Sequence, residues 1–80
     1  MNKFKIGDRV VAIENTYSYG FVYFTEGEKG TVKEVFDYFA SVEFDNDVNG
    51  WGDKQLGIKG GCGAFVNYDK LKLLKERKKR

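Results

Sequence analysis

The stretch GEKGTVKEVFDYFASVEFD, residues 27–45, decides the fold class of this 80-residue chain. Its residues 31–36 mix β-branched and charged side chains, which is typical of a half-buried strand. Residues 41–44 alternate between polar and apolar, with Val42 and Phe44 on one face. The four residues between these two segments are few enough for a hairpin connection. We therefore predict the central antiparallel hairpin of a small all-β barrel.

Three further short strands complete a predicted five-stranded architecture. Residues 10–13 carry apolar side chains on both faces, so this strand should be either covered from both sides or twisted across the barrel. Residues 64–67 indicate another strand, residues 68–70 a one-turn 3₁₀ connector, and residues 71–74 the last strand. The alternative for the chain end is a helix that begins at Asp69 and continues into the basic tail.

Two long loops connect these strands. The first, within residues 15–24, is rich in aromatic residues, and its odd-numbered positions share one face if the loop is extended. The second, residues 45–63, contains six glycines and little hydrophobic pattern. Irregular segments of this length inside a compact domain are usually functional or mobile.

The charge of the chain is divided unevenly. Residues 75–80 contain five basic residues and one acidic residue, whereas residues 1–74 contain nine basic and eleven acidic residues, a net charge of −2. We therefore predict one folded domain over residues 1–74 and a basic, disordered tail over residues 75–80. A groove that follows nucleic-acid phosphates would place Lys and Arg on the domain itself, so the acidic domain counts against nucleic-acid binding.

Two residue types that often form catalytic and metal sites are absent or nearly absent from the chain. It has no histidine, the commonest general base and metal ligand, and its single cysteine, Cys62, excludes an intrachain disulfide and a Cys-rich zinc site. With no visible nucleophile–base pair or phosphate-binding loop, we predict a non-enzymatic protein without a metal or cofactor. No apolar run reaches the length of a membrane span, and the first residues do not read as a signal peptide, so we expect a cytoplasmic protein.

Four short motifs resemble a known family. FKIGDRV at residues 4–10, GEKGTV at 27–32, VEFD at 42–45 and YDKLKL at 68–73 are similar to the small SH3-like proteins common in bacteriophages and prophages, and more distantly to KOW-type and Tudor-like barrels. The resemblance implies a five-stranded SH3-like barrel whose first long loop and strand 2–3 turn flank a binding groove. The Gly-rich loop of those phage proteins ends in an aromatic-Val-Pro-Pro stretch. This chain has no proline, so no role of that loop follows from the resemblance.

Aromatic residues near the loops are the candidate partner-binding site. The candidates are Tyr17, Tyr19, Phe21, Tyr38, Phe39 and Trp51. Exposed rings there suit peptide docking or base stacking, and the alternative is that most of them pack as a small core beneath the first loop. Trp51 lies between two glycines, and it either plugs one end of the barrel or awaits a partner.

Residues 45–50, DNDVNG, match the opening of a calcium-binding loop. The candidate ligands are Asp45, Asp47, Asn49 and Asp53. The twelfth position of such a loop supplies a bidentate Glu, but here it is Leu56. We therefore favour a hairpin exit with an Asn-Gly turn and solvated acids over a weak cation site.

Three functions are consistent with these observations. The first is a non-enzymatic binding module of the phage type, which engages a host or phage protein through the aromatic loop surface. The second is DNA or RNA binding, in which the tail binds phosphates and exposed aromatics stack on bases. The tail residues involved would be Lys75, Arg77, Lys78, Lys79 and Arg80. The third is an inhibitor or small-molecule sponge that acts through the Gly-rich loop. The sequence favours the first function and leaves the partner and the oligomeric state open.

Overall fold

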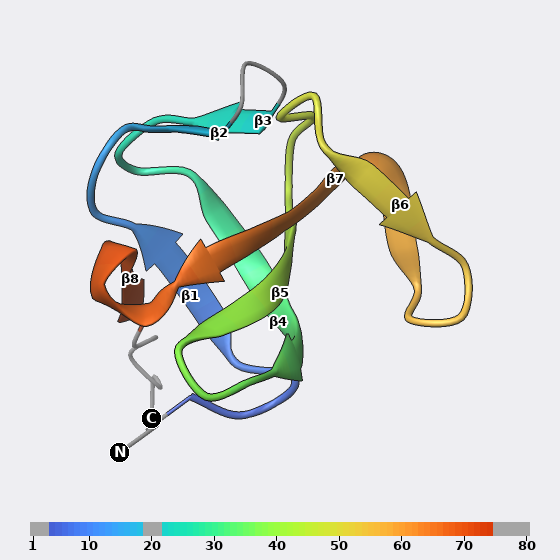
Figure 1. The fold of residues 1–80 in the computed structure, drawn as a ribbon, viewed down its shortest axis with the longest axis horizontal. Helices are drawn as coiled ribbons and strands as arrows, with labels where there is room; N and C mark the ends of the chain where they lie inside the picture. Colours follow the sequence, from blue (N-terminus) through green and yellow to red (C-terminus); the bar gives the residue numbers. More distant parts are fainter. Residues whose placement is uncertain (1–3, 19–21, 75–80) are drawn as a thin grey trace, which may run out of the picture.

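The computed structural model describes residues 4–18 and 22–74 of the chain (Figure 1). Its strands are β1 (Arg9–Ala12), β2 (Thr16–Ser18), β3 (Val22–Phe24), β4 (Lys29–Val35), β5 (Phe39–Phe44), β6 (Trp51–Asp53), β7 (Ile58–Asn67) and β8 (Leu71–Leu73), and a one-turn 3₁₀ helix, η1 (Tyr68–Lys70), precedes β8. The described residues contain no α-helix. The predicted all-β class is therefore confirmed.

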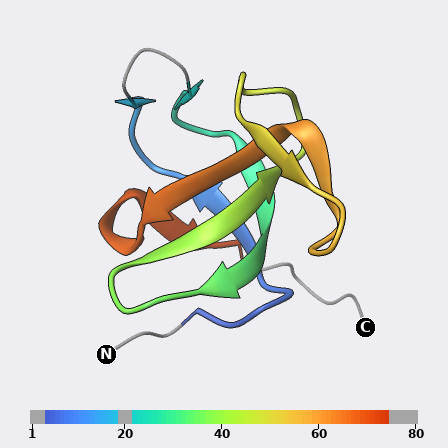
Figure 2. The ribbon, with the colours of Figure 1, turned by 45° about the vertical axis from the view of Figure 1, so that its right-hand side comes forward.

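Six of these strands form one antiparallel sheet in the order β6-β7-β5-β4-β1-β8, and β2 and β3 form a separate hairpin. The sheet is curled, so that β7 crosses in front of β1 in Figure 1, while β5 and β7 run side by side in Figure 2. No pairing joins the edge strands β6 and β8 within the described ranges, so the sheet is open. The structure has more strands than the five predicted, because segments predicted as loops contain strands.

The predicted central hairpin is confirmed, with a shorter connection. β4 and β5 pair antiparallel with Val32 opposite Val42, and a β-bulge follows in β4. Phe39 and Ala40, which the sequence placed in the turn, belong to β5 because both pair with β7. The connection between β4 and β5 is therefore limited to residues 36–38.

Both predicted long loops contain strands. The aromatic first loop holds the β2–β3 hairpin, with Thr16 opposite Phe24. The glycine-rich segment holds β6 and the first half of β7. These two strands approach closely, since a Cβ on Gly52 would lie only 2.7 Å from the Cα atom of Gly60. Glycine allows this contact but carries no side chain, so the strand pair leaves no alternating hydrophobic pattern in the sequence.

The core is built from one face of each central strand. Its fully buried members include Val10 of β1, Val32 of β4, Val42 and Phe44 of β5, and Val66 of β7. Phe24 of β3 stacks on Phe44 with 4.8 Å between the ring centroids. The separate β2–β3 hairpin therefore contributes to the same core as the six-stranded sheet.

The edge of the sheet formed by β1 and β8 differs from the prediction on one point. Val11 is half-buried and Ile13, just after β1, is 41% exposed, so the first of the two alternatives for this strand, cover on both faces, is wrong. β8 pairs with β1 through Leu71 and Ala12, which confirms the predicted last strand over the helix alternative. Residues 75–80, the predicted tail, lie outside the described residues.

Tyr68 of η1 holds the connection between β4 and β5. Its hydroxyl donates a hydrogen bond to the Phe36 carbonyl oxygen at 2.5 Å and accepts one from the Phe36 N–H at 3.1 Å. The Tyr68 ring stacks on the buried Phe4 with 5.2 Å between the centroids, and its N–H donates to the Tyr38 carbonyl oxygen. One residue thus joins the beginning of the described chain, the β4–β5 turn and the end of β7.

We expect Tyr68→Phe to lower the free energy of unfolding by about 1 kcal/mol, because it removes the hydroxyl that binds Phe36 but retains the stacked ring. Urea denaturation followed by circular dichroism measures the change. Tyr38→Phe is the matched control, since the Tyr38 side chain is 79% exposed and its hydroxyl has no hydrogen bond among the described residues. Equal losses in the two variants would contradict the role assigned to Tyr68.

Candidate functional site

Four aromatic side chains from separate segments meet on one face of the sheet. We call Phe36, Phe39, Trp51 and Phe65 the aromatic cluster. Phe36 stacks on Phe39 with 4.8 Å between the ring centroids, and Phe39 meets Phe65 edge to face at 5.5 Å. Trp51 extends the cluster from β6, with its ring 4.9 Å from that of Phe65. Stacked and edge-to-face contacts at these distances are favourable arrangements of aromatic rings.

The aromatic cluster lies on the face opposite the core. Both neighbours of Phe65 in β7 are buried, whereas Phe65 itself is 59% exposed. Phe36 is 39% exposed, and Phe39 and Trp51 are half-buried. Single exposed apolar side chains are common on protein surfaces, but a contiguous exposed apolar patch often marks an interaction site.

The strand register brings these rings together. Phe39 and Phe65 point away from the core because side chains alternate along β5 and β7. Phe65 pairs with Ser41, two residues along β5 from Phe39, so the two rings are diagonal neighbours on one face. Trp51 lies opposite Gly63, where a Cβ would be 2.6 Å from the Trp51 carbonyl oxygen and 2.9 Å from its ring. Glycine at this position therefore lets the indole lie close to β7.

The structure brings together two of the six predicted aromatic residues, Phe39 and Trp51. Trp51 is not a member of the core, so it is not the plug that one alternative predicted. Tyr38 lies next to the cluster in the chain but is 79% exposed and has no ring contact among the described residues. The side chain of Tyr17, and all of Tyr19 and Phe21, lie outside the described residues.

Sequence reasoning missed Phe36 and Phe65 as site residues. Phe65 lies between Ala64 and Val66 in a predicted strand, and this alternation is a signal that its ring points away from the core. Phe36 gave no such signal, because the β-bulge in β4 interrupts the alternation along that strand.

Two acidic side chains accompany the aromatic cluster, and neither takes part in a salt bridge of the described residues. The Glu34 carboxylate accepts a hydrogen bond from the Ser41 hydroxyl at 3.2 Å, and Ser41 lies directly opposite Phe65. Asp37 is exposed in the turn that follows Phe36. Glu43, on the same face of β5, is paired with Lys33 at 3.5 Å, so this ion pair adds no net charge to the two acidic groups beside the rings.

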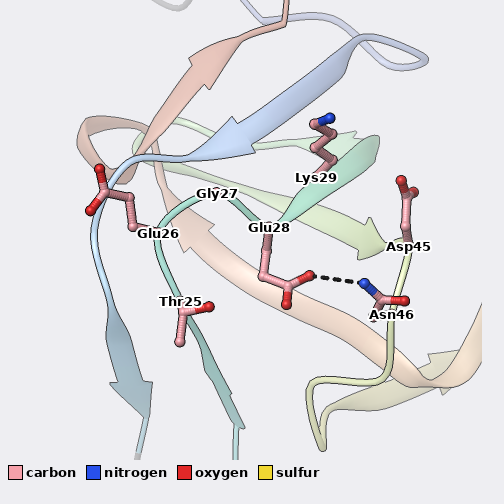
Figure 3. A pocket seen from close by; sticks show the side chains of 7 residues that line it. All are labelled: Thr25, Glu26, Gly27, Glu28, Lys29, Asp45 and Asn46. Carbon is pink, nitrogen blue, oxygen red and sulfur yellow. Dashed lines mark hydrogen bonds between the residues drawn. The ribbon is translucent and has the colours of Figure 1, made fainter.

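A second surface feature is a polar hollow between the β3–β4 connection and the end of β5 (Figure 3). It measures about 400 Å³ and is lined by Thr25, Glu26, Gly27, Glu28, Lys29, Asp45 and Asn46. The Asn46 amide donates to the Glu28 carboxylate at 3.4 Å (Figure 3). The hollow is open to solvent and no feature of it indicates a ligand, so we assign it no function.

The carboxylates of the calcium-like segment serve the fold. Asp45 accepts two hydrogen bonds from the Arg9 guanidinium, at 2.8 and 2.9 Å, and this contact lowers the pKa of the Asp45 carboxyl. Asp47 accepts from the Asn49 N–H at 2.7 Å, and Asp53 accepts from two N–H groups of the following turn. Asn49 has a positive φ of 61°, a conformation that Asn adopts more readily than most residues, but Gly50 does not share it. Among the residues described, no group of three or more His, Cys, Asp or Glu could hold a metal ion.

Cys62 is 3% exposed, and burial raises the pKa of its thiol. The thiolate is the nucleophilic form of cysteine, so a buried thiol that stays protonated is a poor nucleophile. The structure therefore gives Cys62 no environment that would activate it.

Comparison with known proteins adds no family to this description. No family model matches the chain, and neither a curated protein nor a solved structure matches it. Within the described ranges, no helix has the length and apolarity needed to cross a bilayer. The site is therefore interpreted from its own geometry.

We expect Gly63→Ala to displace Trp51 from Phe65, because the new Cβ would collide with the Trp51 carbonyl oxygen and ring. Trp51 is the single tryptophan of the chain, so its fluorescence emission should shift to longer wavelength as the ring becomes more exposed. Gly60→Ala is the matched control, since a Cβ there meets nothing within 4 Å. An emission spectrum that is unchanged in Gly63→Ala would contradict the assigned packing.

The Arg9–Asp45 ion pair should make stability depend on pH in the acidic range. The pKa of Asp45 is lower in the folded chain than its ordinary 3.8, so the contribution of the pair is present above that value and is lost as the pH falls through the folded pKa. We expect the wild type to exceed Asp45→Asn in free energy of unfolding at about pH 6, and the difference to shrink toward about pH 2. Added salt should also reduce it, because the two side chains are 36% and 47% exposed.

Urea denaturation across this pH range measures both variants. Asp37→Asn is the control, since Asp37 is exposed and forms no salt bridge among the described residues. A difference between wild type and Asp45→Asn that stays constant with pH would show that the charge of Asp45 is not what stabilises the fold.

Proposed function

We propose that the chain is a non-enzymatic, cytoplasmic binding module that engages a protein partner through the aromatic cluster. One observation carries the proposal: four rings gather on the face of the sheet that does not cover the core. Aromatic side chains are enriched at the positions that dominate the energy of protein interfaces. The cluster includes the predicted Phe39 and Trp51 and adds Phe36 and Phe65.

The free chain leaves part of the hydrophobic energy of these rings unused. Full burial of a Phe side chain contributes about 1.5–3 kcal/mol, and Phe65 is 59% exposed, so roughly 1–2 kcal/mol is still available to a partner that covers it. The ring contacts within the cluster also restrict the side-chain rotamers before binding. The entropy lost on binding is therefore smaller than for isolated exposed rings.

The proposal includes an SH3-like arrangement of the type found in phages and prophages. It is supported by the long first connection, which holds β2 and β3, and by the one-turn helix η1 before the last strand. The five predicted strands would correspond to β1, β4, β5, β7 and β8. β6 would be an addition that comes between β5 and β7 in the chain and pairs with β7 at the edge of the sheet. The aromatic cluster then includes the turn that the resemblance places beside the binding groove.

The exposed rings of the aromatic cluster would also suit base stacking, so the charges near them decide against the nucleic-acid alternative. The basic residues that it needs belong to residues 75–80, which lie outside the described part of the chain. The acidic Glu34 and Asp37 beside the cluster would repel phosphates. The polar hollow gives no support to the small-molecule alternative either.

Truncation of the cluster should remove binding without unfolding the chain. We expect Phe65→Ser to weaken partner binding by about 30-fold, which corresponds to the ~2 kcal/mol of an interface hot spot. The circular dichroism spectrum should be unchanged, because the Phe65 side chain is largely exposed. The partner is captured from bacterial lysate, identified, purified and titrated with each variant. Ile6→Ser is the matched control, since Ile6 is 67% exposed but lies outside the cluster.

Equal effects of Phe65→Ser and Ile6→Ser on partner binding would overturn the proposal. Binding that survives both Phe65→Ser and Phe39→Ser would do the same. The salt dependence of binding separates the nucleic-acid alternative, since contacts between the tail and phosphates weaken steeply with added salt whereas ring contacts do not.

A further inference from the structure

β7 is paired along only part of its outer edge. On one side it pairs with β5 from Gly63 to Asn67. On the other side β6 meets it at Ile58 and Gly63, and no other strand of the described residues pairs with β7. The last four residues of β7, from Ala64 onward, therefore have an open edge in the part of the chain that the structure describes.

The hydrogen-bond pattern shows which backbone groups face this open edge. In an antiparallel pair, successive residues direct their N–H and C=O groups alternately toward and away from the partner strand. The Tyr68 N–H donates to the Tyr38 carbonyl oxygen at 3.1 Å, so every second residue before Tyr68 also faces β5. The N–H and C=O groups of Phe65 and Asn67 therefore face the open edge, where no described residue binds them.

The chain turns away before it can cover this edge. Val48 and Gly50 both donate their N–H groups to the Gly61 carbonyl oxygen, at 2.8 and 2.9 Å. Between them Asn49 adopts its positive φ, so the chain reverses sharply just before β6 begins at Trp51. In Figure 1, β6 lies beside β7 only near the beginning of β7, at the right of the view.

We propose that an extended, basic segment of a protein partner pairs with β7 as an additional strand at Phe65 and Asn67. The inference rests on the proposed function and specifies how the partner binds. The backbone N–H and C=O groups of both residues would gain partners. Alternate side chains of the segment would project onto the face that carries the aromatic cluster.

Charge complementarity selects a basic segment. On the face of the cluster Glu43 is neutralised by Lys33, whereas Glu34, which accepts from Ser41, and Asp37, which follows Phe36, form no salt bridge among the described residues. Residues 1–74 carry a net charge of −2. A Lys or Arg side chain of the added strand would lie over the faces of Trp51 and Phe65 and within the field of these carboxylates. Pairing of two copies at this edge would place the Glu34 and Asp37 side chains of both copies on the same face, which disfavours self-pairing through β7.

A library of random peptides displayed on yeast tests the inference with the full-length chain. The retained peptides should be enriched in Lys and Arg and should alternate with β-branched or aromatic residues. Each one is then synthesised with an N-methyl group at successive positions, because the methyl group removes one backbone donor. Methylation at alternate positions should weaken binding about ten-fold, as expected for the loss of one hydrogen bond. Methylation at the intervening positions should change it by less than about two-fold.

The Phe65→Ser variant separates this inference from the proposed function. Peptides that require Phe65 but tolerate N-methylation at every position would overturn strand addition and leave binding by the aromatic cluster intact. Peptides enriched in Asp and Glu would overturn the basic segment. If no peptide is retained, strand addition is overturned, and capture of a protein partner with Phe65→Ser decides the proposed function independently.

The same experiment distinguishes two other occupants of the edge. If the basic tail of this chain occupied it, replacing the five basic residues of the tail by Gln would raise peptide affinity about ten-fold or more, because an intramolecular competitor would be removed. If a second copy occupied it, sedimentation would show a dimer that Phe65→Ser dissociates. Either result would overturn a separate partner, whereas unchanged affinity and a monomer support it.

Discussion

The core on one face of the sheet and the aromatic cluster on the other both depend on the register of β5. It lies between β4 and β7 in the sheet, and its register with each of them is fixed over several residues. Ala40, Val42 and Phe44 are buried, whereas Phe39 alternates with them on the other face. Because side chains alternate with a period of two, a shift of one residue would move the core residues into water and the aromatic ring into the core. The free energy that buries the core therefore also holds Phe39 in the aromatic cluster.

Phe36 needs a different restraint, because it lies outside the strands. Its N–H donates to the Phe39 carbonyl oxygen at 2.9 Å and to the Tyr68 hydroxyl, and its own carbonyl oxygen accepts from that hydroxyl. Tyr68 is itself held by stacking on Phe4. The turn that carries Phe36 is thus fixed by η1, which follows directly on the strand that carries Phe65. This arrangement pre-organises the cluster, and pre-organisation lowers the entropy lost when a partner binds.

The sequence predicted those elements that can be recognised from the residues of one segment alone, by their hydrophobic alternation or their turn residues. The alternation of Val42 and Phe44 identified β5, and the YDK turn followed by Leu71 identified η1 and β8. The pairing of β6 with β7 could not be predicted from either segment alone, because it depends on how closely two glycine backbones approach each other.

The aromatic cluster was predictable only in part, for a related reason. Phe39 and Trp51 were candidates because they are aromatic residues in or beside expected loops. Their contacts with Phe65 depend on strand register and on the space above Gly63, which are properties of paired strands and not of one segment. A single sequence shows how side chains alternate along each strand, but it does not show the register in which two strands pair.

The acidic residues near the cluster bear on both self-association and the proposed choice of partner. An exposed apolar face beside an open strand edge is the combination that promotes self-association of β proteins, and charge beside the edge is one way to prevent it. Ser41 is fully buried, and its hydroxyl donates to Glu34, so this carboxylate is held near the rings instead of extending freely into solvent. Like charges would face each other if two copies paired at β7, whereas a basic segment would meet opposite charge. In the proposed strand addition, the same carboxylates would therefore oppose pairing between two copies and favour a basic segment.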